Sequence, residues 1–290
     1  MREKDIVEKH LEDYNDVFAD IINVLLFHGR RLIKENDLEN SSTLSMYKAD
    51  DNELHETERD VSKFWKNANV KIALCGFENQ TTVDKDMPIR VIGYDGQSCR
   101  SQLLKQDDTV PSARYPVITL VLYFGLKHWD KPKTLHGCFD IPKDLLPYVS
   151  DYKINIFEIA YLTNEQVAMF TSDFKIVADY FVQMRKNKDY IPSNEEIQHV
   201  DAILKMMAVL TGDNRFTDAQ QHAKGGNKTM CEVLDKVENR GIEKGLALGE
   251  ERLAGLINKL LADGRTEEIA LATSNQQARN KFYKEYGITC

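Results

Sequence analysis

Two apolar segments separated by a helical one constrain the fold of this chain most strongly. The first covers residues 70–78 and the second residues 116–124, where β-branched and aromatic side chains typical of buried strands predominate. Between them, residues 87–105 have the spacing of a helix despite two internal glycines. A helical crossover between apolar strands is typical of a parallel pair. The sequence therefore predicts an α/β domain whose sheet contains this pair.

Other segments before residue 163 have weaker patterns. Apolar residues recur at helical spacing from residue 4 to 32, which predicts one or two opening helices that end near Gly29. The polar residues 35–56 are predicted to be irregular. Strands are expected at 57–65 and at 152–160 because their residues alternate or are strand-like in type. The core is thus predicted to gain at least two further strands.

The second half of the chain is predicted to be mostly helical. A loop-rich segment is expected at 129–147, and helical patterns begin at Asn164. One of these helices is expected to start with Ser193 as its cap and Glu196 as the partner of that cap. The helices are predicted at residues 164–187, 193–211, 228–262, 266–273 and 275–285.

These patterns divide the chain into two predicted regions. The first is a domain over residues 1–215, with an α/β core to about residue 163 and packed helices at 164–211. A linker is expected at 216–227, which contains a Gly-Gly pair. Residues 228–290 are predicted to form a helical C-terminal region for oligomerisation or regulation.

Composition limits the classes of function. With 38 basic and 46 acidic side chains the formal net charge is −8, so any contact with nucleic acid must be local rather than a property of the whole surface. The five cysteines are widely spaced and include no CxxC pair, which argues against a disulfide framework and a zinc ribbon. No apolar run is long enough to span a membrane and the first residues contain no apolar signal core, so a cytoplasmic protein without a membrane partner is expected.

A pair of carboxylates is the main candidate for chemistry. Glu78 and Gln80 share one face of the strand at 70–80, and a charge at the end of an apolar strand is costly without a partner. A hairpin would bring Asp60, in the preceding strand, beside Glu78, and Mg²⁺ would relieve the repulsion between the two carboxylates. The alternative is structural: Asp60 pairs with Arg59 or Lys63, and Glu78 caps the end of its strand.

Several motifs together resemble a known bacterial family. They lie at Asp16–Leu26, Glu58–Val61, Gly76–Gln80 and Asp86–Arg90, followed by Tyr94. In these segments the chain is similar to the recombination-promoting nuclease/putative transposase family, which belongs to the PD-(D/E)xK nuclease superfamily. The similarity runs from about residue 4 to 215. It implies a restriction-endonuclease-like mixed sheet flanked by helices and followed by an all-helical C-terminal region.

The resemblance also implies roles for individual residues. The metal ligands of the superfamily fall on Asp60 and Glu78, and Gln80 stands where the superfamily has a catalytic lysine. A glutamine orients water but contributes no charge, so Lys85 or Arg90 would supply the positive charge, with Arg90 contacting phosphate. An acidic residue on the opening helix often completes such a site. Here the resemblance points to Asp16, with Glu12 one turn earlier as the substitute.

The function implied by the resemblance is hydrolysis of DNA. We expect a Mg²⁺-dependent, sequence-nonspecific endonuclease associated with recombination or mobile DNA. The alternative is a catalytically weak nuclease-like fold that acts as a DNA-binding or protein-interaction module of a mobile element. An RNA substrate also stays open, because RNA offers the same phosphodiester.

Glycines recur in the C-terminal helical region. Gly241, Gly245 and Gly249 are four residues apart inside a helical pattern, where each costs about 1 kcal/mol relative to alanine. Together with Met230, Leu234, Val237 and Leu248 they form one narrow stripe that a second helix can approach closely. This stripe predicts a homo-oligomer that forms through the C-terminal helix; the alternative is a frayed tail.

Overall fold

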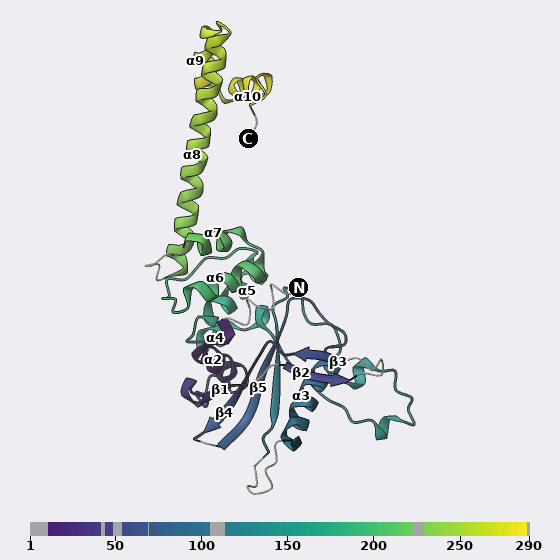
Figure 1. Ribbon diagram of the computed structural model, residues 1–290. Helices are drawn as coiled ribbons and strands as arrows, with labels where there is room; N and C mark the ends of the chain where they lie inside the picture. The colour runs from purple at the N-terminus through teal and green to yellow at the C-terminus, as the bar shows by residue number, and fades with distance from the viewer. Residues whose placement is uncertain are drawn as a thin grey trace. The chain divides into compact units, whose positions relative to one another are not determined.

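A computed structural model describes residues 11–41, 44–48, 54–68, 70–104, 114–222 and 229–288 of the chain. Contacts between residues divide the chain into two compact units, residues 1–232 and 233–290, which are described separately. The first unit contains a sheet with helices on its faces, and the second is helical (Figure 1).

The first unit is built on a mixed sheet with the strand order β1-β4-β5-β6-β7. The three strands on one side pair antiparallel, whereas β5, β6 and β7 run parallel, as predicted for the pair joined by the helical connection. A separate antiparallel hairpin is formed by β2 and β3. The strands are β1 (Leu38–Asn40), β2 (Leu44–Lys48), β3 (Leu54–Glu58), β4 (Val61–Asn67), β5 (Val70–Gln80), β6 (Val117–Tyr123) and β7 (Asn155–Glu158).

The two faces of the sheet are covered by different helices. On one face Phe18 of α2 (Asn15–Leu25) stacks on Phe77 of β5 with the ring centroids 4.4 Å apart. On the other face Met87 of α3 (Met87–Leu104) packs in a buried cluster with Val121 of β6. Successive strand residues point to opposite faces, so a strand that is apolar on both faces, such as β5, buries one set of side chains under each helix. The predicted mixed sheet flanked by helices is confirmed.

Residues 35–56 differ from the prediction that they are irregular. They contain β1, β2 and the start of β3, together with a 3₁₀ turn at Glu35–Asp37. Pairing with a stronger neighbour explains β1, because Leu38 lies opposite Trp65 of the apolar strand β4. The predicted strand at 57–65 is also divided, since β3 ends at Glu58 and β4 begins at Val61.

The helical layer follows β7, and its boundaries differ from those predicted. The predicted helix at 164–187 is interrupted, because Asp20 of α2 accepts hydrogen bonds from the amides of Thr171 and Ser172, both at 2.8 Å. Ser193 does not begin the next helix, which starts at Val200. The amide of His199, directly before it, donates a hydrogen bond of 2.6 Å to the Asp173 carboxylate. The helices are α4 (Asn164–Met169), α5 (Phe174–Asn187), α6 (Val200–Thr211) and α7 (Asn214–His222), and the last occupies part of the predicted linker.

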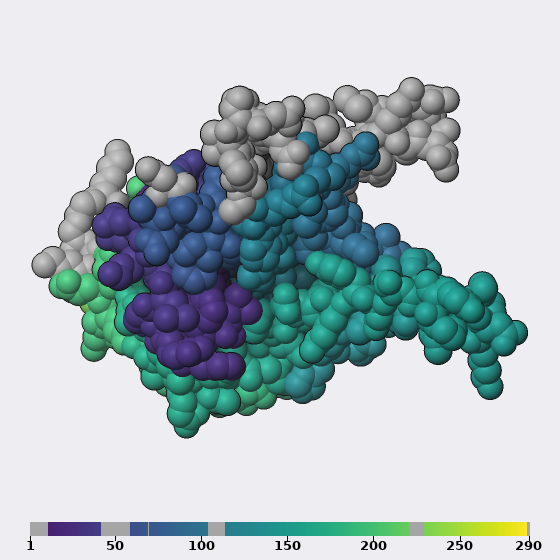
Figure 2. Space-filling model, turned by 90° about the horizontal axis from the view of Figure 1, so that it is seen from below, coloured from purple at the N-terminus to yellow at the C-terminus, as the bar shows by residue number. Residues whose placement is uncertain are grey.

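Between β6 and β7 the chain makes the loop-rich excursion that was predicted. It carries 3₁₀ turns at His136–Cys138 and Leu146–Tyr148, and a third follows β7 at Ile159–Tyr161. Figure 2 shows this segment projecting from the rest of the first unit. Tyr148 is 86% exposed, whereas Trp129 at the start of the excursion is buried in the cluster with Met87 and Val121.

The second unit contains most of one long helix and two short ones. The long helix α8 (Met230–Ala262) begins in the first unit and ends beside α9 (Thr266–Ser274) and α10 (Gln276–Glu285). Leu256 and Leu260 of α8 form a buried cluster with Ala272 and Phe282. The three predicted helices are confirmed with boundaries that differ by at most two residues. Within the described residues, no helix has both the length and the apolar composition that crossing a membrane requires.

Candidate active site

The register of β4 and β5 brings Asp60 and Glu78 together. Val61 is paired with Phe77, so Asp60, directly before β4, lies one step further along and beside Glu78. The Asp60 Oδ2 atom accepts a hydrogen bond of 2.6 Å from the amide of Asn79. This bond holds the Asp60 carboxylate at the open end of the β4–β5 hairpin, next to the predicted site residues Glu78 and Gln80.

Glu78 is almost completely buried, with 2% of its surface exposed. Its Oε1 atom accepts a hydrogen bond from the Arg90 guanidinium and another of 3.1 Å from Gln80 Nε2. Its Oε2 atom is also buried, yet it has no hydrogen-bond partner in the described part of the chain. A buried carboxylate oxygen without a donor is costly, so a cation at this position would satisfy it.

The electrostatics of the site favour a cation. Burial and, secondly, the nearby Asp60 carboxylate raise the pKa of Glu78 to about 8, although Arg90 and Gln80 act in the opposite direction. A divalent ion with oxygen ligands stabilises both carboxylates in their charged form. No group of three or more potential metal-ligating side chains occurs among the residues that the structure describes.

Arg90, in the first turn of α3, places a positive charge beside Glu78. Arg90 forms an ion pair with Glu78, and its Nη1 atom lies 3.1 Å from Asp84. Tyr94, one turn later on the same face, accepts a hydrogen bond of 3.3 Å from Arg90. Lys85 is exposed in the turn before α3 and has no ion pair in the part of the chain that is described. Of the two basic candidates, Arg90 is therefore the one that pairs with Glu78.

The two acidic candidates from the predicted opening helix have different surroundings: Asp16 lies in α2, and Glu12 precedes it. Glu12 is fully buried, and its Oε2 atom accepts a hydrogen bond of 2.8 Å from Asn79 Nδ2, next to Glu78 in sequence. Asp16, in contrast, pairs with Nε2 of His199 at 3.0 Å, and the ring of His199 stacks on Tyr14. Glu12 thus contacts Asn79 on the face of β5 that α2 covers, whereas Glu78 points to the opposite face. Asp16 contacts the helical layer.

A buried network behind the site is not evident from the sequence. Arg59, which precedes Asp60, donates a hydrogen bond to Asp95 of α3 at 2.5 Å. Asp95 also accepts from Thr119 Oγ1 at 2.6 Å and from the hydroxyl of Tyr152. Gly76 leaves room for Arg59, since a Cβ atom there would lie 3.0 Å from Arg59 Cδ. Charged residues at 59 and 95 are visible in the sequence, but their pairing across 36 residues is not.

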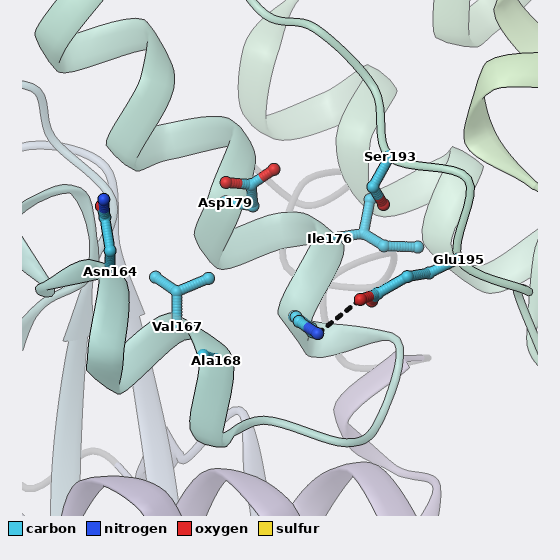
Figure 3. A pocket seen from close by; sticks show the side chains of 8 residues that line it. Asn164, Val167, Ala168, Ile176, Asp179, Ser193 and Glu195 are labelled. Atoms are coloured by element: carbon cyan, nitrogen blue, oxygen red, sulfur yellow. Dashed lines mark hydrogen bonds and ion pairs between the residues drawn. The ribbon is translucent and has the colours of Figure 1, made fainter.

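A cavity of about 210 Å³ lies in the helical layer (Figure 3). Asn164 and Val167 of α4 line it together with Ile176 and Asp179 of α5. Across it, Lys175 pairs with Glu195 at 2.5 Å. The residues that line this cavity include none of the site residues selected from the sequence.

The comparisons with known proteins place residues 50–208 in one family model, described as "Putative transposase, YhgA-like". The matched segment covers more than half of the chain and includes Asp60, Glu78, Gln80 and Arg90, whereas Glu12 and Asp16 precede it. No curated protein and no solved structure matches the chain significantly.

Proposed function

The chain belongs to the family of YhgA-like putative transposases, and on this premise we propose that it is a metal-dependent DNA endonuclease of the PD-(D/E)xK type. The observation that carries the proposal is the buried Oε2 atom of Glu78, which lacks a donor among the described residues, in a carboxylate whose pKa the nearby Asp60 raises. Family membership associates the protein with mobile DNA. We further assign it to the bacterial cytoplasm, where DNA is the available substrate.

The proposed reaction is hydrolysis of a phosphodiester without sequence preference. When bound, Mg²⁺ lowers the pKa of a water molecule and polarises the phosphate. Asp60 and Glu78 would hold the ion. Gln80, whose amide already donates to Glu78, would orient the water. Arg90 would contact the phosphate and supply the positive charge that Gln80 lacks, because its guanidinium lies beside the carboxylates.

Self-association through α8 is the second part of the proposal. Residues 241–250 of this helix are all exposed, although they include apolar side chains such as Ile242, Leu246 and Leu248. A Cβ atom added at Gly241, Gly245 or Gly249 would meet no other atom within 4 Å among the described residues, so the helix surface is open to a neighbour. Burial of this surface against a second copy would stabilise a helix that has no other packing there.

A catalytically weak DNA-binding or protein-interaction module is the second candidate. It is favoured by Gln80, which offers no charge where the superfamily has lysine, and by the net charge of −8. Under this alternative the carboxylate pair would have a structural role, and Arg90 would serve to neutralise Glu78.

Nicking of supercoiled plasmid tests the proposal. The full chain is assayed with Mg²⁺ and with EDTA, beside Asp60→Asn and Glu78→Gln, and with Asp130→Asn as a matched change at an exposed aspartate. We expect Mg²⁺-dependent nicking that falls by about 100-fold or more in the two site variants and is unchanged in the control. A folded wild-type protein that cleaves nothing with several divalent cations would support the binding module. Cleavage of RNA and not of DNA under the same ion would correct the substrate.

A further inference from the structure

An open cavity of about 560 Å³ lies along α3. Ile89, Gly93, Gly96 and Arg100 line it from one face of the helix, since their spacing of three and four residues repeats the helical turn. Arg90 lines the same cavity and contacts Glu78. The cavity therefore adjoins the arginine that pairs with Glu78, and its volume is within the range of ordinary ligand sites.

The end of this cavity that is distant from Arg90 is lined by Arg100. Arg100 is exposed and has neither a hydrogen bond nor an ion pair in the part of the chain described here. No carboxylate is present among the described residues that line the cavity, in a protein whose acidic side chains outnumber the basic ones. A guanidinium presents a planar fork of donors that matches phosphate, so this end of the cavity suits a phosphate group.

The two arginines are separated by a distance that suits a nucleic-acid strand. Arg100 follows Arg90 by ten residues of α-helix, which is a rise of about 15 Å at 1.5 Å per residue. A strand of B-form DNA advances about 3.4 Å per nucleotide, so this spacing corresponds to about four nucleotides. Gly93 and Gly96 lie between the arginines, and a Cβ atom at either would meet no atom within 4 Å in the described part of the chain. A backbone can therefore approach α3 closely there.

We propose that this cavity binds the sugar-phosphate backbone of the DNA strand on one side of the scissile bond, with Arg100 contacting a phosphate about four nucleotides away. The position of the scissile bond rests on the proposed nuclease function, whereas the binding itself needs no catalysis. The cavity thus extends the candidate active site into a track for the substrate, and Arg90 marks its beginning.

The test measures DNA binding by the full chain in EDTA, where cleavage does not occur. Fluorescence anisotropy with a labelled duplex and the matching single strand is recorded over a range of salt concentrations for the wild type, Arg100→Ala and Arg100→Glu. Arg30→Ala, a change at an exposed arginine after α2, is the control. For Arg100→Ala we expect weaker binding and a salt slope reduced by about one unit, with a larger loss for Arg100→Glu and no change for the control.

Because Arg100 has no partner among the described residues, its variants are expected to melt at the wild-type temperature, which separates lost contacts from misfolding. Equal slopes for Arg100→Ala and the wild type would overturn the proposal, as would a wild-type protein that binds neither DNA. A changed slope in a protein that never cleaves would leave this binding track in place and remove only the nuclease proposal. Cleavage by the wild type, together with equal salt slopes for the wild type and Arg100→Ala, would support the nuclease proposal and exclude this binding track.

Discussion

Arg59 and Asp95 form a buried ion pair in which Arg59 Nη2 lies 2.5 Å from Asp95 Oδ1. The side chains are 4% and 8% exposed, respectively, so both charges are shielded from water. Since Arg59 directly precedes Asp60, the pair anchors to α3 the segment that leads to the candidate metal ligand. Burial lowers the pKa of Arg59, while Asp95 counteracts that shift.

Replacing Asp95 by alanine is expected to destabilise the fold strongly. The change leaves the Arg59 guanidinium buried without its charge partner, which typically costs about 3–5 kcal/mol of unfolding free energy. Tyr152→Phe removes one hydrogen bond to the same carboxylate and is expected to cost about 2 kcal/mol. Urea denaturation of the two variants measures both values. A loss below about 1 kcal/mol for Asp95→Ala would show that water reaches Arg59.

Glu78 is expected to make the stability of the ion-free protein depend on pH. Its pKa is raised from 4.5 to about 8, so the folded state binds more protons than the unfolded state between these values. The unfolding free energy therefore falls as the pH rises through this window, by at most about 1.4 kcal/mol per pH unit from this group. Glu78→Gln lacks the titration, and its stability relative to the wild type should increase from pH 5 to 9. Denaturant curves in EDTA at several pH values measure this, and parallel profiles would contradict it.

The opening helix offers a direct comparison between two carboxylates. We expect Glu12→Gln to reduce Mg²⁺-dependent nicking more than Asp16→Asn, because Glu12 bonds to Asn79 whereas Asp16 pairs with His199. The comparison uses nicking rates normalised to the folded fraction of each variant. A larger loss for Asp16→Asn would instead restore the assignment that the resemblance suggests.

Restoring the motif lysine tests the role of charge. In Gln80→Lys an ammonium replaces the amide that donates to Glu78, and it adds positive charge where negative charge develops in the reaction. We expect the nicking rate to rise by about tenfold, which corresponds to about 1.4 kcal/mol of transition-state stabilisation. Single-turnover rates at saturating Mg²⁺ measure the change. A slower Gln80→Lys variant would indicate that Arg90 already provides the charge and that the amide is needed to position water.

Self-association is tested on α8. Leu248 is 59% exposed, and a glutamate there would place a charge in the proposed contact. Leu248→Glu is expected to convert the oligomer to a monomer, whereas Asn239→Glu, on the opposite side of the helix, leaves it intact. Sedimentation velocity of both variants measures the distribution. A wild-type protein that sediments as a monomer at all concentrations would exclude this contact.

The sequence predicts those elements whose side chains carry the signal themselves. The segment from β5 through α3 to β6 is predictable because its apolar runs are continuous, and their parallel pairing follows from the connection. The strands β1 and β2 escape prediction because they lie in a segment with no regular apolar pattern, and β1 depends on pairing with β4. The interruption between α4 and α5 depends on Asp20, which is distant in sequence, and so no local pattern shows it.

In the candidate site, the contacts set by strand register are predictable from the sequence, whereas those between distant segments are not. A hairpin places residues near each other by register, which is why Asp60 and Glu78 can be paired from their strands. Glu12 and Asp16 have helical spacing in the sequence, so periodicity alone does not choose between them. In the structure Glu12 precedes α2, which begins at Asn15. Their partners Asn79 and His199 come from distant segments, and only the folded structure assigns them.

The position of β5 inside the sheet has a consequence for hydrogen exchange. This strand has β4 on one side and β6 on the other, so its amides exchange with solvent only when the sheet itself opens. Strand β1, at the edge, can open locally. We therefore expect slow amide exchange in the part of β5 that carries Glu78 and Gln80. The geometry of the candidate site therefore persists for as long as the domain stays folded.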